Sequence, residues 1–259
     1  MRAELPGRLT LPYSEQGDPA AVPVVLLPGV GDSHRVFEPL LAHLPPDIHA
    51  VALTPRGCGD ATRPRDGYGT PDLAADVAMF LDVLGRDDAV LVGASSGGLV
   101  AQRFAADRPG RVRGLVLLGA PVTLRGNPAV EEFGAGFLTD PVEPAYVRRM
   151  WTSLFRDPVP DNVLDVLVEE NLKVPARVWR ALLEGLVADS SADDLARITA
   201  PVLALCGDRD PVLSLPDQRA RVAALPRASL VVLPDAGHCF YVEEPARPAR
   251  ELTAFVRSL

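Results

Sequence analysis

The chain has 259 residues, of which 47 % are hydrophobic and 23 % are charged, and its formal net charge is −8. This composition is typical of a folded globular protein and excludes a disordered chain. The negative charge makes nucleic acids and anionic membrane surfaces poor partners. No apolar run approaches the roughly 20 residues that a membrane-spanning helix needs, and the polar first eleven residues do not resemble a signal peptide.

The three cysteines, Cys58, Cys206 and Cys239, are far apart, and no C-x-x-C motif is present. An odd number of widely spaced cysteines is typical of free thiols in a reducing compartment rather than of a disulfide framework or a zinc site. We therefore expect a cytoplasmic protein without nucleic acid or membrane partners.

Short apolar runs recur along the chain, and each is continuous rather than alternating. Continuous runs are typical of strands that are buried on both faces of a parallel sheet. A further short strand is expected near the start, at residues 8–13. The continuous runs cover residues 22–27, 48–53, 89–92, 114–118, 202–205 and 230–233.

Amphipathic segments separate most of these runs, and they predict helices. Strands that alternate with helices indicate a doubly wound, mostly parallel α/β domain, here formed by residues 1–121 and 200–259. The expected helices cover residues 36–44, 72–84, 99–107, 216–225 and 245–259.

The alternation is interrupted between residues 122 and 199. This segment contains several short helical patterns, the clearest at 161–172 and 175–187, and no apolar run of the strand type. Pro175 fits the first turn of the second helix. We interpret residues 122–199 as a helical insertion that covers the sheet. Its aromatic residues are Phe133, Phe137, Trp151, Phe155 and Trp179.

Residues 93–97, Gly-Ala-Ser-Ser-Gly, match the pattern G-x-S-x-G. The motif follows an expected buried strand and begins an expected helix, which is the setting that a nucleophile elbow requires. A glycine-rich turn with a helix-capping serine is the simpler interpretation. The strand–turn–helix context favours Ser95 as a nucleophile.

A serine hydroxyl needs a neighbouring base to become a nucleophile. Of the four histidines, His43 and His49 fall on an expected helix and at the start of an expected strand. His34 follows the first central strand and is a candidate substrate contact. His238 follows the last strand on a loop at the same sheet edge as Ser95, so it is the expected base.

The base in turn needs a carboxylate that fixes its tautomer and stabilises its protonated form. Asp208 and Asp210 both follow the strand at 202–205. Asp210 is the preferred acid, because it lies further along the loop, whereas Asp208 is expected to face solvent or Arg209. The chain order of serine, acid and histidine is that of α/β-hydrolases.

The oxyanion of an acyl-transfer reaction needs two backbone N–H donors. We expect them at Ser96, next to the nucleophile, and at Val30, in the loop Pro28-Gly29-Val30-Gly31. A phosphate-binding interpretation of this loop fails, because G-x-G-x-x-G is broken at His34 and no P-loop lysine is present. No metal-binding spacing is found, so no cofactor is expected.

Taken together, these motifs resemble the α/β-hydrolase fold family, specifically its small esterase-like members with a helical cap. The resemblance covers essentially the whole chain. It includes the Pro28-Gly29 loop, where the family often has His-Gly, and the loop at residues 56–59, where Thr54 stands in place of a common aspartate. Serine at the elbow excludes the dehalogenases and epoxide hydrolases, which use aspartate there.

The resemblance implies a serine hydrolase that cleaves a small or medium, mostly apolar carboxylic ester through an acyl-enzyme. Phe137 and Trp151 of the insertion are candidate substrate contacts, although packing against the core is the simpler interpretation of each one taken alone. The same residues would serve a lactonase of the enol-lactonase type, or a hydrolase of carbon–carbon bonds in vinylogous diketones. A ligand-binding receptor on this fold is a further alternative.

Overall fold

The computed structural model describes residues 1–137 and 139–259, which form one eight-stranded sheet with helices on both faces. The strand order is β1-β2-β4-β3-β5-β6-β7-β8. The first two pairings, β1 with β2 and β2 with β4, are antiparallel, and the others are parallel. The strands are β1 (Arg2–Leu5), β2 (Leu9–Gln16), β3 (Val24–Leu27), β4 (Ala50–Leu53), β5 (Ala89–Ala94), β6 (Val112–Leu118), β7 (Val202–Gly207) and β8 (Ala228–Leu233).

The mostly parallel α/β fold expected from the sequence is therefore confirmed. The strand expected at 8–13 is present as the longer strand β2. Strand β1, which was not expected, precedes it in a hairpin, because Gly7 and Arg8 both take positive φ angles and turn the chain back. The helix expected at 36–44 is shorter and ends at Leu41, so His43 lies in a turn.

The described residues form ten α-helices, and six of them pack on the two faces of the sheet. Helices α2, α3 and α8 pack on one face, and α1, α9 and α10 pack on the other. The helices are α1 (Glu38–Leu41), α2 (Thr70–Val83), α3 (Gly97–Asp107), α4 (Pro128–Phe137), α5 (Pro144–Leu154), α6 (Asp161–Leu172), α7 (Ala176–Ala188), α8 (Leu215–Ala224), α9 (Phe240–Glu243) and α10 (Ala246–Val256). Short 3₁₀ helices cover His34–Phe37, Pro109–Arg111 and Leu195–Arg197.

The core forms two layers because successive residues of a strand point to opposite faces. In β5, Val90 and Val92 belong to the cluster under α1 and α10, whereas Ala89 and Leu91 belong to the cluster under α2 and α3. All four are essentially inaccessible to solvent. This burial on both faces explains why the strand reads as a continuous apolar run.

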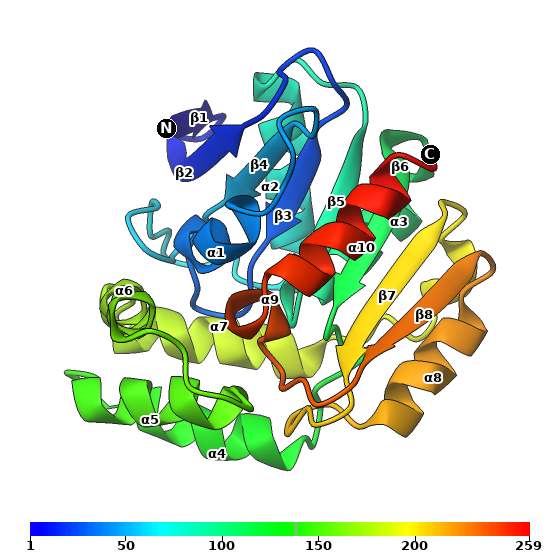
Figure 1. The fold of residues 1–259 in the computed structure, drawn as a ribbon. Coiled ribbons are helices and arrows are strands. Elements are labelled where there is room, and N and C mark those ends of the chain that lie inside the picture. Colours follow the sequence, from blue (N-terminus) through cyan, green and yellow to red (C-terminus); the bar gives the residue numbers. More distant parts are fainter. Residues whose placement is uncertain (138) are drawn as a thin grey trace.

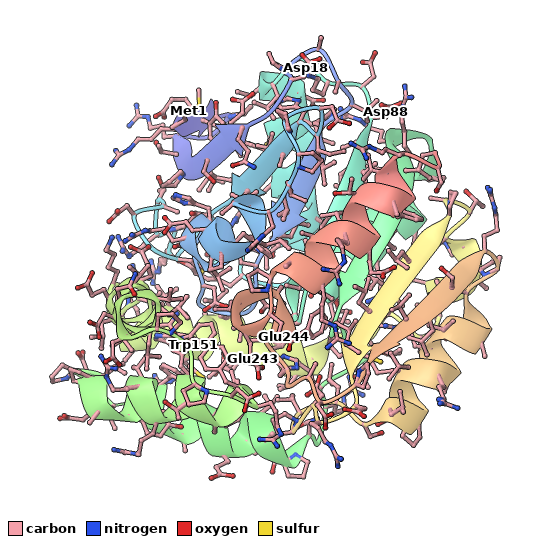
Figure 2. All side chains as sticks on the ribbon, viewed as in Figure 1. Met1, Asp18, Asp88, Trp151, Glu243 and Glu244 are labelled. Atoms are coloured by element: carbon pink, nitrogen blue, oxygen red, sulfur yellow. The ribbon has the colours of Figure 1, made fainter. Side chains whose placement is uncertain are left out.

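Helices α4 to α7 follow one another between β6 and β7, and in Figure 1 they gather at one end of the sheet. Figure 2 marks Asp18 and Asp88, which precede β3 and β5, at the opposite end. The carboxyl ends of the parallel strands therefore point toward α4–α7. Within residues 1–137 and 139–259, no helix is both long and apolar enough to cross a membrane.

Candidate active site

Ser95 lies at a sharp turn between β5 and α3, with a positive φ of 49°. The turn leaves no room for side chains at the glycines around it: a Cβ on Gly93 would lie 2.5 Å from the Cα of Gly98, and one on Gly97 would lie 2.3 Å from the carbonyl oxygen of Leu27. A non-glycine residue in this region of backbone space is strained by about 1–3 kcal/mol, and such strain is common at functional sites. The glycines therefore permit a turn that presents Ser95 at the end of the sheet.

Three side chains from three loops meet at this edge. The Nε2 atom of His238 lies 3.0 Å from Ser95 Oγ, and its Nδ1 atom lies 2.7 Å from Asp210 Oδ2. The side chains of His238 and Asp210 are almost fully buried. The structure thus brings together the serine, the histidine and the acid that the sequence placed after β5, β8 and β7.

The carboxylate of Asp210 is held at both oxygens. While Oδ2 faces His238, Oδ1 accepts from the backbone amides of Val212 and Leu213 at 2.8 and 2.9 Å. Asp208, by contrast, accepts from the amide of Asp235 and is partly exposed. Of these two aspartates, only Asp210 contacts His238.

The backbone of His238 is anchored to the helices that follow β6. Its amide donates to the carbonyl of Leu154, at the end of α5, over 2.9 Å. A Cβ on the preceding Gly237 would come within 2.8 Å of that carbonyl and of the Arg156 amide. The histidine loop is therefore packed directly against the end of α5.

The two expected oxyanion donors belong to two different loops near Ser95. Val30 belongs to the loop after β3 and lines the same cavity as Ser95, whereas Ser96 directly follows the serine. In the described part of the chain, neither amide donates a hydrogen bond to another protein group. Both amides are thus available for a bound oxygen.

A cavity of about 80 Å³ lies beside Ser95 and His238, with walls from both the sheet edge and the helices of residues 122–199. Its aromatic walls are Tyr241, from α9, and four residues of the segment 122–199, Phe133, Phe137, Trp151 and Trp179. Trp151 (labelled in Figure 2) lies at the end of the molecule where α4–α7 gather. No arginine or lysine is among the described lining residues.

Two sequence expectations about this cavity have different outcomes. Phe137 and Trp151 do line it, as do Phe133 and Trp179, which were not singled out. His34 is not among the described lining residues, and its Nδ1 atom lies 2.6 Å from Thr54 Oγ1. Burial lowers the pKa of His34. His49 is buried beside Glu15 and is remote from the site.

Sequence reasoning also missed a carboxyl group among the lining residues, that of Asp32. Asp32 is 7 % exposed, and burial raises the pKa of its carboxyl to about 7. Its only sequence signal was its position two residues after Val30, in the loop expected to bind the oxyanion.

The chain belongs to the α/β-hydrolase fold family, whose model matches residues 22–245. Fold, family and relatives together make it a hydrolase of the esterase type. Among curated relatives, a poly(3-hydroxyalkanoate) depolymerase of Ectopseudomonas oleovorans is 29 % identical, over 93 % of this chain and 86 % of its own length. The 3-oxoadipate enol-lactonase 1 of Acinetobacter baylyi is 24 % identical, over 96 % and 94 %. The structure of the esterase RhEst1 from Rhodococcus sp. ECU1013 matches with a TM-score of 0.89 at 27 % identity, covering 100 % of this chain and 98 % of that chain.

Proposed function

We propose that this protein hydrolyses a small or medium, mostly apolar carboxylic ester through an acyl-enzyme on Ser95. The observation that carries the proposal is the continuous contact from Asp210 through His238 to Ser95, at 2.7 and 3.0 Å, beside an apolar cavity. A hydroxyl, an imidazole and a buried carboxylate in this arrangement activate serine as a nucleophile.

The reaction has two halves. Ser95 Oγ attacks the ester carbonyl while His238 Nε2 takes its proton, and the amides of Val30 and Ser96 stabilise the oxyanion. His238 then returns the proton to the leaving alcohol, and the acyl group remains on Ser95. Water, deprotonated by His238, attacks the acyl-enzyme; His238 returns the proton to Ser95 Oγ as its bond to the acyl carbon breaks, and the carboxylic acid is released. Asp210 orients His238 and stabilises its protonated form in both halves.

The cavity supports an uncharged substrate. Its walls are mainly aliphatic and aromatic, and the described lining residues offer no cation that could pair with a substrate carboxylate. Burying an unpaired charge is costly, so anionic substrates are disfavoured. This argues against carbon–carbon hydrolysis of acidic diketones, which would need such a partner.

Lactone hydrolysis is the second candidate. A lactone is a cyclic ester, so it needs the same nucleophile, base and oxyanion donors, and the similarity to an enol-lactonase over 96 % of the chain favours it. An uncharged lactone fits the cavity better than an anionic one, for the reason given above.

We further propose that residues 122–199 act as a cap over the core of residues 1–121 and 200–259. Support comes from the four aromatic cavity walls that this segment supplies and from the contact of Leu154 with His238. The cytoplasm is the proposed location, supported by three cysteines that are all free and buried.

The direct test combines a substrate panel with the variant Ser95→Ala. The wild type is assayed with p-nitrophenyl esters of increasing chain length, uncharged lactones and an acidic dienone diketone. We expect ester hydrolysis in the wild type, and its loss in S95A with the circular dichroism spectrum unchanged. Labelling with a fluorophosphonate should modify Ser95. Near-normal ester hydrolysis by S95A, or a label on another serine, would refute the mechanism.

A further inference from the structure

Asp32 is a buried carboxyl group for which the hydrolysis described above has no use. It lines the same cavity as Ser95 and His238. A Cβ placed on Gly29 would lie 3.0 Å from Asp32 Oδ2 and 3.5 Å from the Cβ of Ser95. The carboxyl group and the nucleophile therefore lie on either side of a single glycine.

The two oxygens of Asp32 have different surroundings. Oδ1 accepts from Asn171 Nδ2 at 3.0 Å, and the same Nδ2 group lies 3.0 Å from the carbonyl oxygen of Gly31. The other end of the Asn171 amide accepts from Trp151 Nε1 at 2.8 Å. Oδ2, in contrast, has no hydrogen-bond partner within residues 1–137 and 139–259.

Oδ2 is open to the cavity, because it is not among the side-chain oxygens that are both inaccessible to solvent and without a partner. A ligand group in the cavity can therefore reach Oδ2 and form a hydrogen bond with it. The neighbouring polar groups do not supply this hydrogen bond, since Tyr241 Oη donates to Cys239 Sγ over 3.6 Å. Asp32 Oδ2 is therefore a hydrogen-bonding oxygen at which this apolar cavity can recognise a substrate beyond its ester group; Trp179 Nε1, which also lacks a partner among the described residues, can only donate.

We propose that Asp32 binds a hydroxyl group of the substrate, so that the enzyme prefers apolar esters that carry one hydroxyl close to the scissile carbonyl. This inference rests on the proposed ester hydrolysis. A hydroxyl both donates and accepts, and it therefore pairs with a carboxyl group in either protonation state. The short distance across Gly29 places the hydroxyl within one or two carbons of the carbonyl carbon.

Other substituents fit this site less well. A keto oxygen only accepts, so it pairs with the protonated carboxyl alone. A carboxylate would lie beside a second acid with no cation among the described lining residues. An ammonium group would lose its hydration in a mainly apolar cavity, next to a carboxyl group that burial keeps largely neutral below pH 7.

A purely structural role for Asp32 is the alternative. Through Asn171, it joins the loop after β3 to helices α5 and α6, so its loss could simply loosen the site. A loosened site would change the hydrolysis of all esters by a similar factor. A specific hydroxyl contact changes only the hydrolysis of esters that carry the hydroxyl.

The test compares ethyl 3-hydroxybutanoate with ethyl butanoate, which differ by one hydroxyl. The ratio of their kcat/KM values is measured in the wild type, D32L and D32N, with D208N as a control at an aspartate outside the cavity. One hydrogen bond of ordinary strength is worth about tenfold. We expect the wild type and D208N to prefer the hydroxy ester about tenfold, D32N to keep most of this preference, and D32L to lose it.

If the wild type hydrolyses the two esters with nearly equal kcat/KM, the inference is overturned, whatever the variants show. Equal loss of both activities in D32L, with the ratio unchanged, also overturns it and leaves Asp32 a structural role. If D32L does not fold, the wild-type and D32N ratios decide.

Affinity measurements test the hydroxyl contact independently of the proposed ester hydrolysis. The affinities of S95A for the two intact esters are compared by calorimetry, alone and combined with D32N. Hydrolysis of neither ester by the wild type refutes the ester-hydrolase proposal. A tenfold tighter binding of the hydroxy ester by S95A then still supports the hydroxyl contact, whereas equal affinities refute it.

Discussion

Asp210 and His238 lie on loops that follow two neighbouring parallel strands, β7 and β8, and 2.7 Å separates Asp210 Oδ2 from His238 Nδ1. The two loops are packed closely, since a Cβ on Gly207 would lie 2.2 Å from the carbonyl oxygen of Ala236. Because Asp210 Oδ1 is also fixed by two backbone amides, the carboxylate has little freedom to turn away from the histidine.

This contact predicts a sharp difference between two nearby aspartates. In Asp210→Asn, the amide favours the wrong tautomer of His238, and we expect kcat to fall by about 10⁴. In Asp208→Asn, the carboxylate that accepts from the Asp235 amide is replaced at a partly exposed position, and kcat should change less than threefold. Steady-state kinetics with p-nitrophenyl butanoate measure both. The reverse pattern would assign the acid to Asp208 and leave the fold unchanged.

The buried carboxyl of Asp32 predicts that stability depends on pH. Its pKa is raised to about 7 in the folded protein, mainly by burial, against about 3.9 in an unfolded chain. The folded state therefore binds the proton more tightly, and the stability that this proton contributes is lost as the pH rises toward 7. His238 and Asn171 oppose the shift, while burial keeps the thiols of Cys58 and Cys239 protonated across this range.

Asp32→Asn removes this titration. Between pH 5 and pH 8, the free energy of unfolding of D32N should rise by about 3 kcal/mol relative to that of the wild type. Urea denaturation of both proteins at pH 5, 6.5 and 8 measures the difference. Tyr241, whose pKa burial raises well above its usual value, does not titrate here. If the free energies of unfolding of D32N and the wild type differ by the same amount at all three pH values, Asp32 is ionised throughout this range.

Gly31 predicts a second effect on stability, through the helices over the site. Its φ is +79°, and a Cβ there would lie 1.8 Å from the Cη2 atom of Trp179 on α7. Gly126 also has a positive φ, of +67°, but a Cβ there would meet nothing within 4 Å. Both alanine variants bear the backbone strain of about 1 kcal/mol, and only Gly31→Ala must also displace Trp179.

We therefore expect G31A to lower the melting temperature more than G126A does, and to raise KM for p-nitrophenyl butanoate severalfold. Differential scanning calorimetry and steady-state kinetics provide the two measurements. Equal effects of the two variants would mean that Trp179 moves aside at no cost.

The fold and the three central residues of the site could be predicted because their signals are local. Ser95, Asp210 and His238 each follow a continuous apolar run, and parallel strands bring their carboxyl ends to one edge. Asp32 could not be predicted, because Asn171, which binds it, lies 139 residues further along the chain. The sequence around Asp32 contains no pattern that indicates the burial of its side chain.

The residues that form the cavity walls could not be predicted either, because they too depend on contacts between distant segments. Spacing within α4, α5 and α7 indicates which residues share a helix face, but it does not indicate how the helices cross. In the structure, Phe137 stacks on Trp179 with ring centroids 3.9 Å apart, so two helices that are distant in sequence form one wall. His34 was a candidate contact from its loop position alone, and the side chain turns instead to Thr54.

The final prediction concerns chain-length selectivity. Phe137 lines the cavity, whereas Phe155 is not among the described lining residues and instead stacks on Trp151 at 5.9 Å. One methylene in an apolar pocket is worth about 1–3 kcal/mol, or roughly 10–200-fold in kcat/KM. Phe137→Ala enlarges the cavity, so it should shift the preferred p-nitrophenyl ester toward longer acyl chains by a factor in this range. Phe155→Ala is the matched control and should leave the preferred length unchanged.

Trp151→Ala should shift the preference in the same direction as F137A, with an added loss for every ester, because Trp151 also holds the amide of Asn171 that binds Asp32. The measurement is kcat/KM for acetate to decanoate esters in the wild type and the three variants. Saturating p-nitrophenyl acetate should give a nearly unchanged kcat in F137A, since neither Ser95 nor His238 is disturbed. If F137A and W151A both retain the wild-type chain-length profile, selectivity arises from the loops around Val30 and His238, and the proposed cap only covers the site.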